Sequence, residues 1–450
     1  MKTLAAILIA LGLLMPPTAS SQNKIFPYKY STDDLPNGLR VITIPTDYPN
    51  IVALYIVVST GSRNEVEPGK SGFAHLFEHL MFRGTEKVSA EKYNEALKAA
   101  GADTNAYTSA DRTVYHTVFS KEDLDQIMML EADRFQNLKV PEDLFKTETR
   151  AVLGEYNKNS ANPATKLFEV MRETAFKKHT YQHTTMGYLR DVQNMPNMYD
   201  YSLEFFRRYY RPEYTTIVVS GDVKRDNVLA LVKKYWGDWK RGNYVPDIPA
   251  EPEQTEERAA AVDWPSPTLP WVAVGYKAPA YSDEQKDKPA LDLIGSLGFS
   301  ATSDLYQRLV IKEQKVDTLF VDFDDHPDPY LFTVGARVKD PKDVDYVRNE
   351  IIKTFDSFKA APVAKDRLDA VKSNLKYSFA LSLDNSEAIA ANIAPYIALR
   401  RTPETLNKLY DVYNSVTPED IHQMAKKYFV EKHRTIVTLS HKEKSQDATK

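Results

Sequence analysis

The sequence predicts an α+β protein of two homologous domains, each a mixed, largely antiparallel sheet with helices packed on one side. Three observations support this prediction. Strand-like segments are followed by runs of helical pattern, without strict alternation of strand and helix. A proline-rich stretch divides the chain into two parts of ~200 residues, a typical domain size. The segments that begin and end the first part have counterparts in the second.

Composition narrows the function classes. The 450 residues include 58 Lys and Arg against 62 Asp and Glu, so the formal net charge is −4. With 42% hydrophobic residues the chain can build packed cores, which excludes a wholly disordered protein. The charge balance gives no electrostatic reason to expect nucleic acid as a partner. There is no cysteine, which excludes disulfides, thiolate catalysis and cysteine-bound zinc.

Residues 1–20 have the pattern of a cleaved secretory signal peptide. Lys2 precedes an apolar run from Leu4 to Met15, and Thr18-Ala19-Ser20 supplies small residues for cleavage. Twelve helical residues span ~18 Å, too short for a ~30 Å hydrocarbon core, which argues against the alternative of an uncleaved anchor. We therefore expect a periplasmic or secreted protein whose mature chain has no membrane span.

The proline-rich stretch and an internal duplication set the domain boundaries. Prolines 246, 249, 252, 265, 267 and 270 favour an exposed linker at the front of this stretch. We expect a first domain at 21–244, a linker at 245–257, a second domain at 258–442 and a polar tail at 443–450. The apolar strand Ile51–Val58 is matched by Trp271–Tyr276. A terminal helix and strand at 198–210 and 214–220 are matched at 417–429 and 434–440.

Further elements follow from local signals. Ser120 is expected to cap a helix whose apolar face includes Leu124, Ile127 and Phe135, and we interpret that face as core. Ser89 is expected to cap a helix that ends at Gly101. The residues 113–119 are β-branched and aromatic, which predicts a strand.

The segment His75-Leu-Phe-Glu78-His79 carries the sharpest chemical signal. It lies in a stretch without internal proline or glycine, so we expect a helix in which positions i and i+4 share one face. His75 and His79 can then direct ring nitrogens at one metal ion, and Glu78 can reach a water molecule beside it. The alternative is two ordinary histidines on a helix.

A catalytic zinc site normally has three protein ligands, so one more must come from elsewhere. The best second helix is 141–159, which carries Glu142, Glu148 and Glu155. Glu148 and Glu155 are two turns apart and share a face. We take Glu155 as the third ligand and Glu148 as a carboxylate that orients a ligand, although spacing alone does not choose between them, and a solvated acidic face is the alternative.

These residues resemble the pitrilysin/insulinase and mitochondrial processing peptidase family of inverted-zincin metallopeptidases, in its two-domain bacterial type. The matching segments are 61–65, 72–85, 105–108, 111–113, 148–155, 210–212 and 221–222, together with Tyr115. The resemblance covers essentially the whole mature chain. It implies one zinc ion per chain held by His75, His79 and Glu155, with Glu78 as general base and Glu148 as a supporting acid. Gly154 departs from the family, which often has a second glutamate there.

The resemblance also implies how substrate binds and which partner is needed. Asn105, Ala106 and Thr108 lie in a segment similar to the family's substrate-edge strand, where an extended peptide adds as a further strand. For Asn105 a simple turn residue is the alternative. In the second half, Val310 and Asp317 or Thr318 stand where the family has an arginine and a tyrosine that hold substrate. We therefore expect a related second subunit that supplies this pair, with a homodimer as the alternative.

Other candidates rank lower. His179 matches a family position but is interpreted as structural, and His116 as a core or edge residue of a strand. Asp322, Asp324, Asp325 and His326 form an acidic group that the neighbouring prolines place in a hairpin loop, without the regular pattern of a calcium loop. The sequence thus predicts an exported zinc metalloendopeptidase. The alternative is a non-catalytic scaffold or partner subunit of the same fold.

Overall fold

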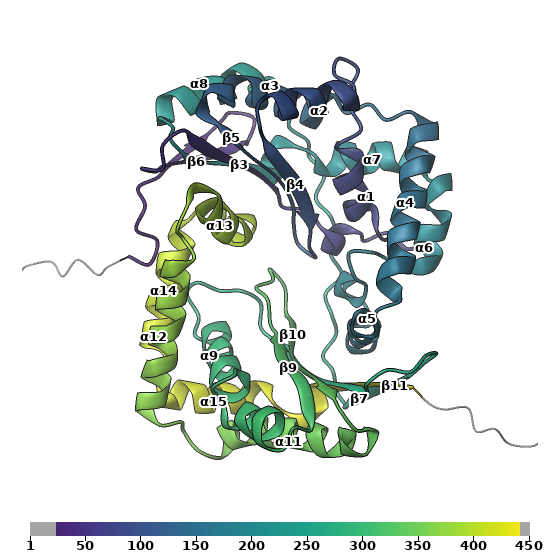
Figure 1. The fold of residues 1–450 in the computed structure, drawn as a ribbon, viewed down its shortest axis with the longest axis vertical. Helices are drawn as coiled ribbons and strands as arrows, with labels where there is room; N and C mark the ends of the chain where they lie inside the picture. Colours follow the sequence, from purple (N-terminus) through teal and green to yellow (C-terminus); the bar gives the residue numbers. More distant parts are fainter. Residues whose placement is uncertain (1–23, 442–450) are drawn as a thin grey trace, which may run out of the picture.

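The computed structural model describes residues 24–441, in two sheets with helices around and between them (Figure 1). The predicted signal peptide, 1–20, and the whole of the predicted polar tail, 443–450, lie outside the described residues. The first sheet has the strand order β1-β2-β6-β3-β5-β4. Its strands are β1 (Ser31–Asp34), β2 (Arg40–Pro45), β3 (Ile51–Val58), β4 (Asp103–Thr108), β5 (Thr113–Ser120) and β6 (Thr215–Gly221).

The second sheet has the order β7-β11-β8-β10-β9. Its strands are β7 (Arg258–Trp264), β8 (Trp271–Ala278), β9 (Val316–Asp322), β10 (Tyr330–Val338) and β11 (Arg434–His441). Strand for strand this repeats β2-β6-β3-β5-β4. In both sheets the first pair of this set is parallel and the other pairs are antiparallel. The predicted fold class of two related, largely antiparallel α+β halves is confirmed.

The helices follow the same duplication. The first half contains α1 (Phe73–Leu80), α2 (Ala90–Ala99), α3 (Leu124–Asn137), α4 (Glu142–Ser160), α5 (Pro163–Ala175), α6 (Leu189–Asn194), α7 (Tyr199–Tyr209) and α8 (Arg225–Trp236). The second contains α9 (Asp287–Phe299), α10 (Asp304–Tyr306), α11 (Val344–Ala360), α12 (Lys365–Leu381), α13 (Ser386–Arg400), α14 (Glu404–Ser415) and α15 (Pro418–Tyr428). α1 follows β3 as α9 follows β8, and α7 precedes β6 as α15 precedes β11.

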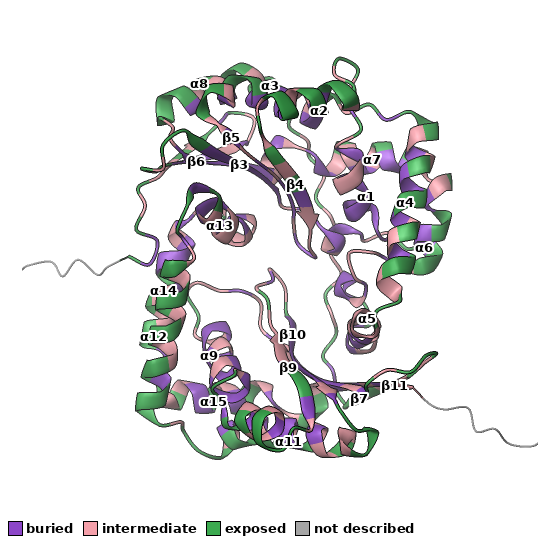
Figure 2. Cartoon of the chain, in the orientation of Figure 1, coloured by how far each residue is buried: buried purple, intermediate pink, exposed green. Residues whose placement is uncertain are grey.

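One helix of each half packs on the sheet of the other half. α13, from the second half, packs on β3 and β6, and its Ile389, Ile393 and Ile397 share a core with Ala53 and Tyr55. In return α5, from the first half, packs on β7, β8 and β11. The sequence predicted helices on one side of each sheet, and the helix on the opposite face comes from the other half (Figure 1). Both faces of β3 and β6 are therefore buried (Figure 2).

Of the two predicted helix caps, Ser89 and Ser120, one is met and one is wrong. Ser89 accepts a hydrogen bond from the N–H of Lys92 at the start of α2, as expected for an N-cap. Ser120 makes no capping bond, because a short 3-10 turn intervenes and α3 begins after Asp123. Residues 245–257 form no helix or strand. Val245 is exposed there, but Glu251 is bound by backbone N–H groups of residues 177–179.

Candidate metal centre

Helix α1 carries both histidines of the motif and lies between α4 and the edge strand β4. Six of the eight residues of α1 are buried, and most of these are apolar. Their side chains hold the helix against the core. Gly72 precedes it with φ of 92°, a left-handed conformation that suits glycine. Helix α1 therefore enters from a tight backbone turn and presents His75, Glu78 and His79 on consecutive turns.

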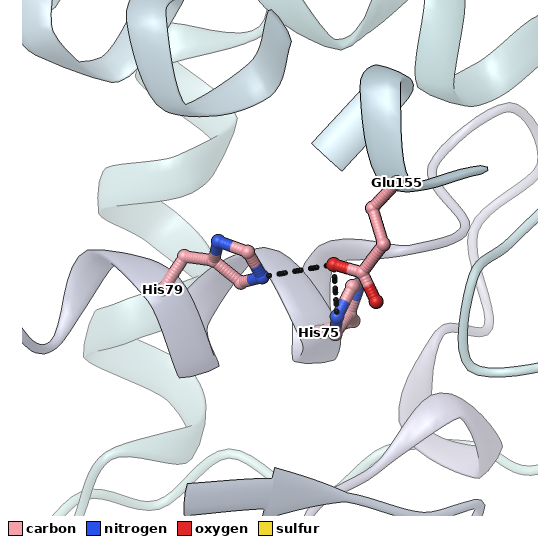
Figure 3. Close-up of side chains that lie close together, drawn as sticks. All are labelled: His75, His79 and Glu155. Carbon is pink, nitrogen blue, oxygen red and sulfur yellow. Dashed lines mark ion pairs between the residues drawn. The ribbon is translucent and has the colours of Figure 1, made fainter. Parts of the chain in front are cut away.

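The structure brings His75, His79 and Glu155 together (Figure 3). The two rings come from α1 and the carboxylate from α4, with one ligand atom of each residue within 4.8 Å of the others. Oε2 of Glu155 lies 3.6 Å from Nε2 of His75 and 3.4 Å from Nε2 of His79. The ring planes are nearly perpendicular, at 85°. It is the single group of this kind found among residues 24–441.

These distances fit a zinc ion. Zinc bonds of about 2.0–2.2 Å in a tetrahedral arrangement separate the ligand atoms by roughly 3.3–3.6 Å. The two nitrogen-to-oxygen distances fall in this range. Burial lowers the pKa of His75, although the nearby Glu78 and Glu155 oppose that shift. Burial thus favours the neutral ring, which is the form that binds a metal.

Glu148 lies behind His79. Its Oε2 is 3.9 Å from Nδ1 of His79 and makes no hydrogen bond within the described part of the chain. Its Oε1 pairs with Nε of Arg83 at 2.9 Å. A carboxylate on the outer nitrogen of a ligating histidine fixes the tautomer and orientation of the ring. Glu148 thus lies on the outer side of His79, but at a distance too long for a hydrogen bond.

Glu78 is joined to the strand beside it. The hydroxyl of Thr108, the last residue of β4, donates to Oε2 of Glu78 at 2.7 Å. β4 is the outer strand of the first sheet, so one of its edges is free of strand partners within the described residues. Ala106 is buried, and its N–H is bound by Oδ1 of the exposed Asn105. The free edge thus begins beside the carboxylate that the sequence predicts as the base.

The lower-ranked candidates lie apart from this group. His179 pairs with Asp328 at 3.0 Å, and His116 stacks on Tyr55. The acidic residues 322–326 do lie in the β9–β10 hairpin, where Asp325 pairs with the buried Lys288 and His326 with Asp111.

The family resemblance places a substrate-holding arginine and tyrosine in the second half, where this chain has Val310 and Asp317 or Thr318. Val310 is half-buried against the hydrophobic core of the second half, and Asp317 is paired with Arg337.

Three residues of the centre were not predicted from the sequence. Arg83 binds Glu148, and Asn159 donates to Oε1 of Glu155 at 3.4 Å. Asn159 stands four residues after Glu155 on the same helix, a spacing that could have identified it. The third is Glu65, whose two oxygens accept the N–H groups of Gly72 and Ala74 at 2.8 Å each. Burial raises the pKa of Glu65 to about 8, against the opposing effect of these N–H groups.

Comparison with known proteins places the chain. Residues 40–188 match the model of the insulinase family (peptidase family M16), and residues 198–375 match the peptidase M16 inactive domain. The zinc protease PqqE of Helicobacter pylori is 30% identical over 434 residues, which cover 95% of this chain and 96% of that protein. A probable mitochondrial-processing peptidase subunit beta of Arabidopsis thaliana is 26% identical over 88% of this chain and 76% of its own length.

A solved structure agrees. The crystal structure of a protease from Helicobacter pylori superposes with a TM-score of 0.86 at 30% identity, over 92% of this chain and 99% of the other. Sequence, topology and duplication thus lead to one assignment. The chain belongs to the insulinase, or M16, family of peptidases.

Proposed function

We propose that this protein is an exported zinc metalloendopeptidase that cleaves peptides or unfolded segments of proteins. The observation that carries the proposal is the convergence of His75, His79 and Glu155, with Glu78 on the same short helix. A relative of nearly equal length is named a zinc protease, which supports the same chemistry. In the proposed centre one zinc ion per chain is held by these two rings and this carboxylate.

Zinc in such a site would polarise the scissile carbonyl and make a water molecule more acidic. Glu78 is the proposed general base. One of its carboxylate oxygens takes the proton of the attacking water and later passes it to the nitrogen of the leaving amine. Thr108 holds the other oxygen, which fixes the direction of the carboxylate. Glu148, on the outer side of His79, would orient that ring once the two groups close to hydrogen-bond distance.

The proposed substrate is an extended peptide that pairs with the free edge of β4. Backbone pairing accepts many sequences, because it uses groups that every residue has. The Asn105 side chain now occupies the N–H of Ala106, so a bound peptide would take its place. Thr108, the last residue of the strand that would pair with the peptide, hydrogen-bonds Glu78 through its hydroxyl and would so connect the two.

A second, related subunit is part of this proposal. Neither Val310 nor Asp317 can supply the positive charge and the phenol that the family resemblance implies opposite the metal. A heterodimer would enclose substrate between two chains, and a homodimer is the alternative. Should the chain alone, shown by light scattering to be monomeric, cleave peptides at full rate, the partner is not needed.

The location is proposed from the N-terminal pattern: a periplasmic or secreted protein, released by cleavage near residue 20. In the described residues, 24–441, no helix has both the length and the apolarity of a membrane crossing. The second candidate function is a non-catalytic scaffold or partner subunit. It is disfavoured by the ligand geometry, since a scaffold has no need of a carboxylate placed beside two histidines.

One pair of variants tests the proposal. Glu78→Gln is expected to abolish cleavage of a fluorogenic peptide library and to keep zinc near one per chain, measured by mass spectrometry of the metal. Glu155→Gln should lose the zinc as well. Glu95→Gln, on the exposed face of α2, is the matched control and should change neither. Cleavage by Glu78→Gln would remove Glu78 from the mechanism, and a wild-type chain without metal would favour the scaffold.

A further inference from the structure

The helix that carries the two histidines starts without a capping side chain. α1 has only eight residues, and its N-cap position is Gly72, which makes no side-chain bond. The first N–H groups of any helix lack partners inside it and need acceptors from elsewhere. In so short a helix the position of the first turn also sets the position of His75, which is the third residue of the helix.

Glu65 supplies these acceptors. It lies seven residues before Gly72, at the end of a short 3-10 turn that follows β3. Oε2 accepts from the N–H of Gly72 and Oε1 from the N–H of Ala74, both at 2.8 Å. The side chain of Glu65 is completely buried. One carboxyl group thus ties the first turn of α1 to the segment beyond β3.

The two histidines differ in what orients them. Nδ1 of His79 has a carboxylate oxygen of Glu148 3.9 Å away. Nδ1 of His75 is buried and has no hydrogen-bond partner in the part of the chain that the structure describes. With no group on its outer nitrogen, the ring of His75 takes its place from the backbone to which it is attached. That backbone begins at Ala74, the residue that Glu65 holds.

We propose that Glu65 is a positioning residue of the metal centre, which sets the place of His75 through the first turn of α1. Its bonds go to the backbone of that turn and not to the ligand atoms of the metal centre. The inference rests on the proposed zinc site. A second buried acid offers a comparison, because Asp191 accepts bonds from the N–H and hydroxyl of Ser71, just outside α1.

The test compares Glu65→Gln with Asp191→Asn, two buried acids changed to their amides. In Glu65→Gln the side-chain amide keeps one acceptor and places an NH₂ where the second acceptor stood, so one N–H of the first turn of α1 loses its partner. We expect zinc binding, measured by competition with a chromophoric chelator, to weaken about tenfold, in line with other supporting residues of metal sites. Asp191→Asn should leave zinc affinity within about twofold even where it lowers the melting temperature equally.

A second measurement needs no metal. Hydrogen–deuterium exchange of the apo-protein should accelerate in the peptide that covers residues 72–76 in Glu65→Gln, and stay unchanged there in Asp191→Asn. Unaltered zinc affinity in Glu65→Gln, or equal weakening in both variants, would overturn the role of Glu65 and leave the zinc site standing. A wild-type chain that binds no zinc would instead overturn the proposed function, and this inference with it.

Discussion

The exchange of helices between the two halves predicts that they unfold together. Ile393 of α13 is fully buried, and its neighbours in the core include residues of β3 and β6 in the other half. Ile393→Ala removes three carbon atoms, worth about 2.4 kcal/mol at ~0.8 kcal/mol each. The cavity left behind adds to this loss, and measured costs of such changes are about 2–5 kcal/mol. We expect a loss of about 3 kcal/mol in the free energy of unfolding.

The assay is urea unfolding with pulsed hydrogen–deuterium exchange, read separately in peptides from β3 and from β10. Both peptides should become unprotected at the same urea concentration, and Ile393→Ala should lower that concentration equally for both. Ile351→Ala is the reciprocal variant, since Ile351 is equally buried but packs in the second half's own core, and it should also lower both midpoints together. If β3 opens early in Ile393→Ala while β10 keeps its wild-type midpoint, the halves are independent and the reasoning is refuted.

Two further predictions concern charge and metal. Burial lowers the pKa of Lys277 to about 7, so between pH 7 and 10 the unfolded chain holds a proton that the folded lysine lacks. The contribution of Lys277 to the free energy of unfolding therefore rises with pH. The free energy of unfolding gained by Lys277→Met, measured by urea unfolding, should be greatest near pH 7 and shrink by about 1.4 kcal/mol per pH unit above it. An advantage that does not change with pH would contradict this. Zinc at a hundredfold excess over its dissociation constant should raise the free energy of unfolding by about 2.7 kcal/mol, an effect that a chelator abolishes and Glu155→Gln lacks.

Some features of the centre could be predicted from the sequence because they depend on local periodicity. The spacing of His75 and His79 places both on one helix face wherever that helix lies. Glu155 and Glu148 were found the same way, but their shared face left their roles open. What distinguishes them is their distance from the two rings, because Oε2 of Glu155 lies near Nε2 of both histidines and Oε2 of Glu148 lies near Nδ1 of His79 alone.

Other features left no such signal. The bonds of Glu65 go to backbone N–H groups, which every residue except proline carries, so nothing in the sequence of α1 indicates a partner. The position of α13 was hidden for a different reason. Its apolar residues indicate that the helix is buried. Because the hydrophobic effect is non-directional, they do not indicate against which sheet the helix packs. The exchanged helices therefore appeared only in the structure.

The duplication also explains why one chain is expected to have one metal centre. α9 follows β8 as α1 follows β3, so the same scaffold exists twice. In the second copy the helix carries Lys288, whose buried ammonium lies 2.7 Å from Asp292 and 3.0 Å from Asp325. A lysine provides one fixed positive charge and no open coordination position, so this copy balances its buried acids internally. In the first copy the corresponding helix carries His75 and His79 beside Glu155, and this is where the proposed zinc ion would bind.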